Sequence, residues 1–130
     1  SRGLGDVYKR QAKAYTKQKA DKKAMEDYRE LAKDTRNPYG AEAKYQVAQS
    51  LYDAKEYAAA EKELLNYIEQ STPHAYWLAR SFILLSDVYH ATGKDLDARQ
   101  YLLSLQQNYQ GNDDIESMIE SRLSKLKVEN

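Results

Sequence analysis

A large apolar or aromatic residue is followed three times, nine positions later, by an alanine, and four positions after that by another large residue. The three sets are Tyr15, Ala24 and Tyr28, then Leu51, Ala60 and Leu64, then Tyr89, Ala98 and Leu102. The alanines are 36 and 38 residues apart, a period typical of helical repeats. A small residue lets two helices approach closely, and the large one fills the space between neighbouring repeats. The spacing therefore predicts stacked helical hairpins.

The local patterns give the boundaries of these hairpins. Apolar residues recur every three or four positions on both sides of each predicted turn, as in amphipathic helices. Asn37-Pro38 and Thr72-Pro73 each provide a capping side chain and a first-turn proline, and Gly93 suits the left-handed end of a helix. A further break is expected near Gln18–Asp21, inside the first repeat. We predict an all-α chain, with repeats at about 5–40, 41–78 and 79–111 and a terminal helix at 112–127.

Composition excludes several classes of function. The 20 Lys and Arg residues balance the 20 Asp and Glu residues, so net charge gives no attraction to nucleic acid or to an anionic membrane. The lysine-rich segment Lys13–Lys23 contains Asp21 and is followed by Glu26 and Asp27, which indicates a solvated helix face. There is no cysteine, hence no disulfide, thiolate metal site or thiol nucleophile. No apolar run reaches the roughly 18–20 residues that span a bilayer.

No motif of catalysis or of cofactor binding is present. The sequence lacks the nucleophile elbow, the phosphate-binding glycine loops and the paired histidines of zinc proteases. His74 and His90 are sixteen residues apart, without a carboxylate or another histidine at metal-ligand spacing. We therefore expect a protein that is not an enzyme and that has no cofactor and no metal.

The first eleven residues, SRGLGDVYKRQ, resemble a translated sequencing adapter. On this interpretation Ser1–Gln11 is an artefactual leader, and the natural domain occupies residues 12–127. A signal peptide or an upstream domain could then have been lost. The absence of cysteine fits a reducing cytosol and a disulfide-free periplasmic protein equally well.

The repeats resemble the tetratricopeptide repeat (TPR) family, whose pattern is W-x2-L-G-x2-Y, then A-x3-F, then P, over about 34 residues. The matching positions are Phe82, Leu85, Ser86, Tyr89, Ala98 and Leu102 in the third repeat, Lys44, Val47, Ala48, Leu51, Ala60 and Leu64 in the second, and Tyr8, Gln11, Ala12, Tyr15, Ala24 and Tyr28 in the first. Alanine or serine replaces the glycine, the prolines fall late or are missing, and inserted residues lengthen the turns between repeats.

The resemblance implies a right-handed α-solenoid. Such extended, degenerate repeats are similar to those of bacterial envelope TPR proteins. We accordingly expect a C-terminal fragment of a longer bacterial protein, with the periplasm or cell envelope favoured over the cytoplasm.

The resemblance also implies a concave groove, lined by one face of the first helix in each hairpin. Carrying the family positions across gives Glu42, Tyr45, Gln49, Tyr52 and Asp53 from the second repeat and Arg80, Ile83, Asp87 and His90 from the third. Tyrosine and arginine are favoured as binding anchors. Tyr15, Tyr28 and Tyr89 are instead expected in the core. The family's carboxylate clamp of Lys and Asn is not reproduced, because Gln49 and Leu84 stand at its positions, which disfavours chaperone-tail binding.

The leading hypothesis is a scaffold that binds a protein or peptide segment in this groove without chemistry. One alternative is a structural spacer or oligomerisation segment whose groove is filled by its own chain. Another is an accessory TPR domain of a larger, truncated envelope enzyme or transporter. An unfilled groove with Tyr45 and Tyr52 exposed would favour binding over the spacer.

Overall fold

The computed structural model describes residues 2–70 and 72–126, and within these ranges the chain forms six α-helices and no strand. The helices are α1 (Arg2–Leu31), α2 (Pro38–Asp53), α3 (Tyr57–Glu69), α4 (Ala75–Ala91), α5 (Asp95–Asn108) and α6 (Ile115–Leu123). The predicted all-α class is confirmed.

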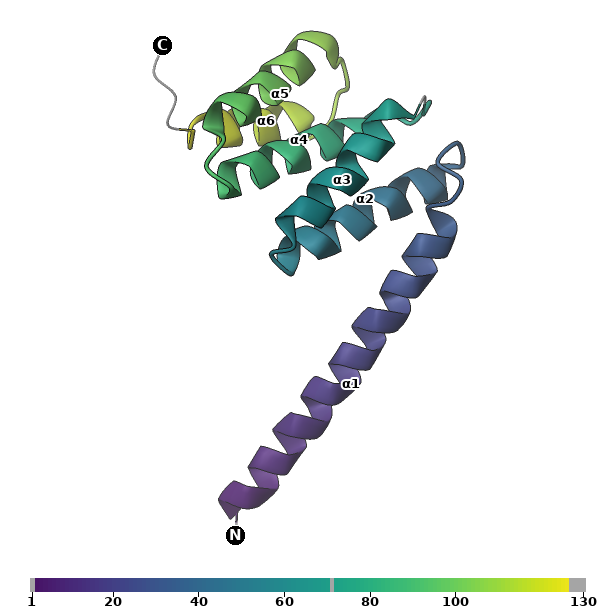
Figure 1. Cartoon of the computed structure of the whole chain (residues 1–130), viewed down its shortest axis with the longest axis vertical. Helices are drawn as coiled ribbons and strands as arrows, with labels where there is room; N and C mark the ends of the chain where they lie inside the picture. Colours follow the sequence, from purple (N-terminus) through teal and green to yellow (C-terminus); the bar gives the residue numbers. More distant parts are fainter. Residues whose placement is uncertain (1, 71, 127–130) are drawn as a thin grey trace.

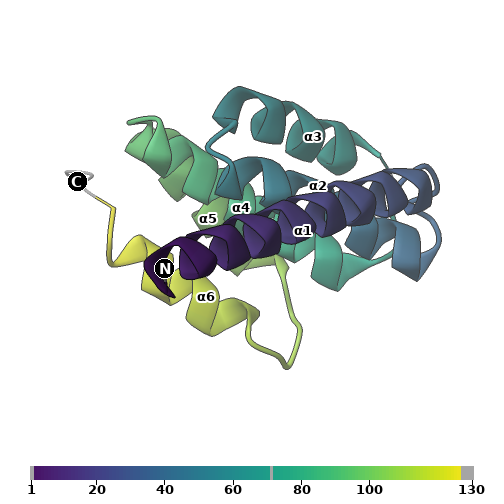
Figure 2. The ribbon, with the colours of Figure 1, turned by 90° about the horizontal axis from the view of Figure 1, so that it is seen from below.

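Most of the helices form two successive hairpins, α2–α3 and α4–α5, that pack against each other (Figure 1). The first helices of the hairpins, α2 and α4, are neighbours, and α6 follows as the next helix against α4. The second helices lie behind them, since α3 contacts α4 and α5 contacts α6. The C-terminal part of α1 packs on α2, the first helix of the next hairpin, as α3 packs on α4 (Figure 2).

The nine-residue spacing coincides with buried positions in both hairpins. The buried residues at equivalent positions are Val47, Ala48, Leu51, Ala60, Leu64 and Tyr67 in one hairpin and Leu85, Ser86, Tyr89, Ala98, Leu102 and Leu105 in the other. Ala60 and Ala98 have no exposed surface at all. They lie as the packing argument requires, with the small residue where the two helices of a hairpin meet.

The two hairpin turns have the same backbone geometry. Each has one residue at positive φ, four positions after the large residue of the first helix: Lys55 at 61° and Gly93 at 79°. Beyond it, the Glu56 amide donates to the Leu51 carbonyl at 2.9 Å, and the Lys94 amide to the Tyr89 carbonyl at 2.8 Å. Gly93 adopts this left-handed conformation without steric strain, as predicted, whereas Lys55 adopts it despite its side chain.

The terminal helix completes the core next to the second hairpin. Ile115 and Ile119 of α6 have no exposed surface and belong to one cluster with Ile83, Leu102 and Leu105. Because α5 presents its apolar side to α6, removing α6 would expose that cluster to water.

The first repeat differs from the prediction. Helix α1 continues without a break through Gln18–Asp21, so no hairpin forms there. The segment contains neither glycine nor proline, and its residues are compatible with helix, so local propensity extends the helix. Tyr15 is consequently 59% exposed, and its predicted place in the core is wrong. Tyr28 is half-buried against the main core cluster and Tyr89 is buried, as expected.

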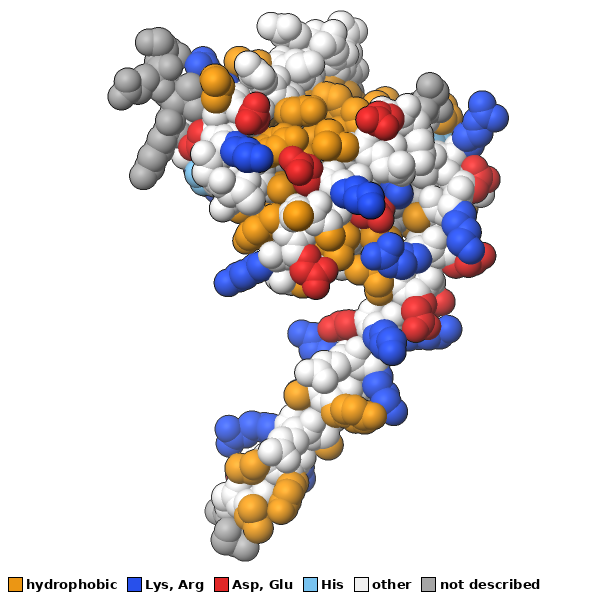
Figure 3. Space-filling view, viewed as in Figure 1, with side chains coloured by type: hydrophobic (Ala, Val, Ile, Leu, Met, Phe, Trp, Pro, Cys, Tyr) orange, Lys and Arg blue, Asp and Glu red, His pale blue; other side chains and the backbone are white. Residues whose placement is uncertain are grey.

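The N-terminal part of α1 projects away from the rest of the molecule. Figure 3 shows hydrophobic side chains along this projecting part, and the largest of them, Leu4, Val7, Tyr8 and Tyr15, are all exposed. Every described side chain up to Asp21 is exposed. This part of α1 therefore contributes little packing to the folded body.

Several boundaries differ slightly from those expected. Asn37 caps α2 as predicted, with its side chain accepting from the Tyr39 amide at 2.9 Å. Pro73, however, precedes α4 and is not in its first turn. The terminal helix is shorter than 112–127, because Asp113 accepts from the Ile115 amide at 3.0 Å and the helix begins there. Residue 127 lies outside the described residues.

The packing predicts unequal effects of two terminal deletions. Removing residues 1–11 should leave the melting temperature nearly unchanged, because the described side chains there are exposed. Removing residues 112–130 should lower it clearly, since Ile115 and Ile119 leave the core. Thermal melts followed by circular dichroism measure both. Equal losses would mean that the leader packs on the body.

The alanine positions provide a second test. Leucine at Ala60 or Ala98 should destabilise the protein by about 1–3 kcal/mol, because the added carbons have no space between the helices. Ala59→Leu, at the exposed neighbouring position, should change the free energy of unfolding by less than about 0.5 kcal/mol. Urea melts compare the three variants. A larger loss at Ala59 would shift the repeat register by one residue.

Candidate functional site

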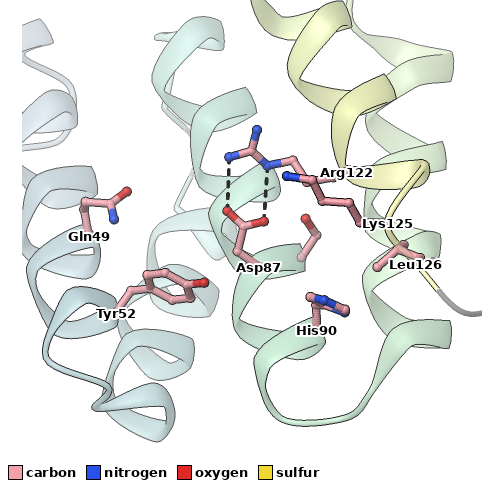
Figure 4. Close-up of a pocket in the computed structure, with 8 residues that line it drawn as sticks. Gln49, Tyr52, Asp87, His90, Arg122, Lys125 and Leu126 are labelled. Atoms are coloured by element: carbon pink, nitrogen blue, oxygen red, sulfur yellow. Dashed lines mark hydrogen bonds and ion pairs between the residues drawn. The ribbon is translucent and has the colours of Figure 1, made fainter.

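A cavity of about 400 Å³ opens between α2, α4 and the end of α6 (Figure 4). Its lining residues are Gln49, Tyr52, Ser86, Asp87, His90, Arg122, Lys125 and Leu126. Four of the predicted groove residues, Gln49, Tyr52, Asp87 and His90, therefore lie together. Gln49 and Asp87 are 38 positions apart, as are Tyr52 and His90, so successive hairpins supply equivalent side chains.

The cationic side of the cavity comes from α6 and the residues after it. Arg122 Nε lies 3.2 Å from Asp87 Oδ1, and the Arg122 NH2 group donates to Asp87 Oδ2 at 3.3 Å. This paired contact connects α6 to α4 and orients the guanidinium along the cavity wall. Lys125 adds a second, exposed cation at the same rim.

The opposite wall is formed by Tyr52 of α2, which extends toward α4 (Figure 4). Burial, and then the nearby negative charge of Asp87, raise the pKa of Tyr52 above the ordinary value of a tyrosine. Its hydroxyl therefore stays protonated at neutral pH and can donate a hydrogen bond. Gln49 holds its own side-chain amide toward Asp53, donating to Asp53 Oδ1 at 2.8 Å.

The structure does not bring all predicted groove residues into this cavity. Tyr45 is only 5% exposed, so the expectation of an exposed Tyr45 is wrong. Its hydroxyl donates to Gln49 at 2.9 Å and accepts from the Arg80 NH2 group at 3.0 Å. The Arg80 guanidinium also lies 4.9 Å from the centre of the Tyr45 ring and donates to the Tyr76 hydroxyl. Tyr45 and Arg80 therefore bridge α2 and α4.

The remaining predicted positions also fall elsewhere. Ile83 is 1% exposed and belongs to the core beside α6. Glu42 is half-buried on α2 and does not line the cavity. Asp53 is exposed and lines a different groove, between α1 and α2. The family positions identify one face of each helix, but packing covers part of that face.

Arg122, Lys125 and Leu126 were missed by the sequence reasoning. The sequence predicts the terminal helix, but among the described residues no second helix follows it from which a register could be assigned. One signal was present: Arg122 follows Asp87 by 35 residues, as Arg80 follows Tyr45. In both pairs an arginine reaches back to the preceding first helix of a hairpin.

The site offers hydrogen bonding and charge rather than a catalytic arrangement. Within the described ranges, no group of three or more His, Asp or Glu side chains is placed to hold a metal ion. The ring of His90 contacts Asp95 at 2.8 Å, and the ring of His74 contacts the Arg36 carbonyl at 2.6 Å. Among the helices of the described residues, none is long and apolar enough to cross a membrane.

Searches for relatives identify none: no protein-family model, curated protein or solved structure matches this chain significantly.

The two groove tyrosines should respond differently to truncation. Tyr45→Ala should destabilise the protein by about 3–5 kcal/mol, as expected for loss of a buried aromatic side chain. Tyr52→Ala should have a smaller effect, since Tyr52 is half-buried at the cavity wall. Urea melts of the two single variants measure the difference. Equal free-energy losses would place Tyr52 in the core and close the cavity.

Proposed function

We propose that this chain is a TPR-like interaction module, a fragment of a right-handed α-solenoid, that binds a protein or peptide segment without chemistry. The binding site is the cavity between α2, α4 and α6. The observation that carries the proposal is that equivalent side chains of two successive hairpins, Gln49 with Asp87 and Tyr52 with His90, line one open cavity. A repeated face that stays uncovered suits an extended chain lying across the helices.

The chemistry of the cavity suits such a segment. Its volume of about 400 Å³ accommodates side chains rather than a folded domain. The Tyr52 hydroxyl donates hydrogen bonds and its ring offers apolar surface, the combination that makes tyrosine a frequent binding anchor. Lys125 provides a positive charge at the rim, where an acidic or polar residue of the partner would be favoured.

The burial of Tyr45 supports the spacer as a second candidate. Arg80 covers its ring and fills the interval between α2 and α4 at that end. A module closed along its whole concave side would act as a rigid connector in a longer protein. The third candidate, an accessory domain of a larger envelope protein, is a proposal about context and is compatible with either role, as is a location in the bacterial cell envelope.

Peptide selection on the intact chain tests the binding proposal. Peptides are selected from a displayed random library and their affinities measured by calorimetry against wild type, Tyr52→Ala and His90→Ala. Loss of a central anchor should weaken binding by about 2 kcal/mol, roughly thirtyfold. Tyr39→Ala is the matched control, because Tyr39 is 70% exposed and lies outside the cavity.

Thermal melts of the same variants show whether each still folds. Selected peptides that bind Tyr52→Ala and His90→Ala as tightly as wild type would contradict the proposed site. A selection that yields no specific peptide would favour the spacer.

A further inference from the structure

A second groove, of about 770 Å³, lies between α1 and α2, and no residue of α4 lines it. Its lining residues are Lys17, Asp21, Lys22, Ala24, Met25 and Tyr28 of α1 and Gln46, Ser50, Asp53 and Ala54 of α2 and its C-terminus. It shares none of these residues with the cavity described above. The groove is therefore a separate surface, formed by the other edge of the repeat array.

The two hairpins show that the equivalent surface between α3 and α4 is covered by another helix. Helix α4 packs against α3 and also against α2, the first helix of the preceding hairpin. The pair α3 and α4 is covered by α2, which contacts both helices. The pair α1 and α2 is packed in the same way as α3 and α4, but among the described residues no preceding helix covers it as α2 covers the other pair. One helix position is thus empty, and the α1–α2 groove marks it.

The sequence contains the segment whose register fits this position. Ala12 and Tyr15 stand where the second and third repeats have Ala48 with Leu51 and Ser86 with Tyr89, and those four residues are all buried. Tyr15, by contrast, is 59% exposed and carries only Lys19 of its own helix over its ring. Ala24, the alanine of the same repeat, is exposed in the groove.

This segment does not reach its own groove, because α1 is straight. In the two hairpins, the turn position is occupied by Lys55 and Gly93, both at positive φ. The equivalent residue in the first repeat is Lys19, which lies within the continuous helix α1. Lys55 shows that a lysine can make this turn, so residue type alone does not decide; the residues around Lys19 are good helix formers, and helix α1 continues through them. The segment is therefore held away from the groove of its own chain and is available to another.

We propose that two copies of this chain pair through reciprocal exchange, with residues 12–18 of each copy occupying the α1–α2 groove of the other. The two α1 helices then run antiparallel. Such an exchange is self-complementary, as a twofold dimer requires. In both copies it buries the repeat positions, such as Tyr15 and Ala24, that are exposed in a single chain. The proposal does not depend on the proposed peptide binding, because the two surfaces are separate.

The charges favour this pairing. Residues 12–20 carry Lys13, Lys17 and Lys19 and no acidic residue. The receiving groove contains Asp21 and Asp53 together with Lys17 and Lys22. Residues 21–31 carry four acidic and three basic side chains, so with Asp53 the receiving part is slightly negative, whereas residues 12–20 carry only positive charge. The groove also adjoins the C-terminus of α2, the negative end of its helix dipole. An antiparallel arrangement brings the basic segment of one copy against the slightly negative part of the other.

Sedimentation equilibrium on the full chain over a range of concentrations tests the proposal. We expect a monomer–dimer equilibrium for wild type and at least a tenfold larger dissociation constant for Tyr15→Glu. Tyr39→Glu is the matched control, since both tyrosines are more than half exposed and neither change should unfold the monomer. Removal of residues 1–11 should leave the dimer intact, because the exchanged segment lies after them.

A second variant separates exchange from simple contact. Lys19→Gly should release the turn restriction, let the segment fold back on its own groove and shift the equilibrium toward monomer. Lys23→Gly weakens the same helix at an exposed position that is neither the turn equivalent nor part of the groove lining, so it should shift the equilibrium less. A wild-type chain that is monomeric throughout, or a dimer unchanged by Tyr15→Glu, would overturn the proposal. A dimer weakened by Tyr52→Ala instead would place the contact at the concave cavity, and would also overturn it.

Discussion

The close approach of two helices at Ala60 and Ala98 is the contact on which the remaining structure depends. Neither alanine has exposed surface, and a larger side chain at either position would hold the hairpin apart. Once the helices meet there, Leu64 and Leu102 enter the space between neighbouring helices and the apolar sides of α2 and α4 are fixed. The opposite sides of α2 and α4 then form the surface on which the cavity opens. The cavity is thus a consequence of where the hairpins close.

Two arginines connect the successive first helices along that surface, with opposite results. Arg80 lies over the Tyr45 ring and bonds its hydroxyl, which closes the surface between α2 and the start of α4. Arg122 reaches Asp87 from α6 and remains 30% exposed in its side chain, so the surface stays open around it. Both arginines are half-buried, but the Tyr45 ring beneath Arg80 is buried, whereas the pair of Arg122 and Asp87 lines the open cavity. One end of the surface shared by α2 and α4 is therefore packed and the other accessible.

The sequence predicts the second and third repeats better than the first, although all three share the same spacing. Tyr15 and Ala24 are nine residues apart like their counterparts, but a hairpin also needs a residue that turns the chain, and Lys19 lies among good helix formers. Repeat positions group Gln49, Tyr52, Asp87 and His90, which line one cavity, because helical periodicity fixes the face on which a residue lies. They fail for Tyr45, whose burial depends on the long side chain of Arg80, a contact between helices that no single-helix pattern contains.

The position of Arg122 connects the cavity to the stability of the terminal helix. Its guanidinium joins α6 to α4 through Asp87 and at the same time lines the cavity. A segment bound in the cavity, as proposed, would contact α2, α4 and the end of α6 together, so its binding free energy would add to the packing of Ile115 and Ile119 against the second hairpin. An acidic partner residue that took the Arg122 guanidinium from Asp87 would oppose this effect, because it would replace an intramolecular contact with an intermolecular one. Lys125, which has no such structural contact with α4, is the cation that can meet an acidic partner without loosening α6.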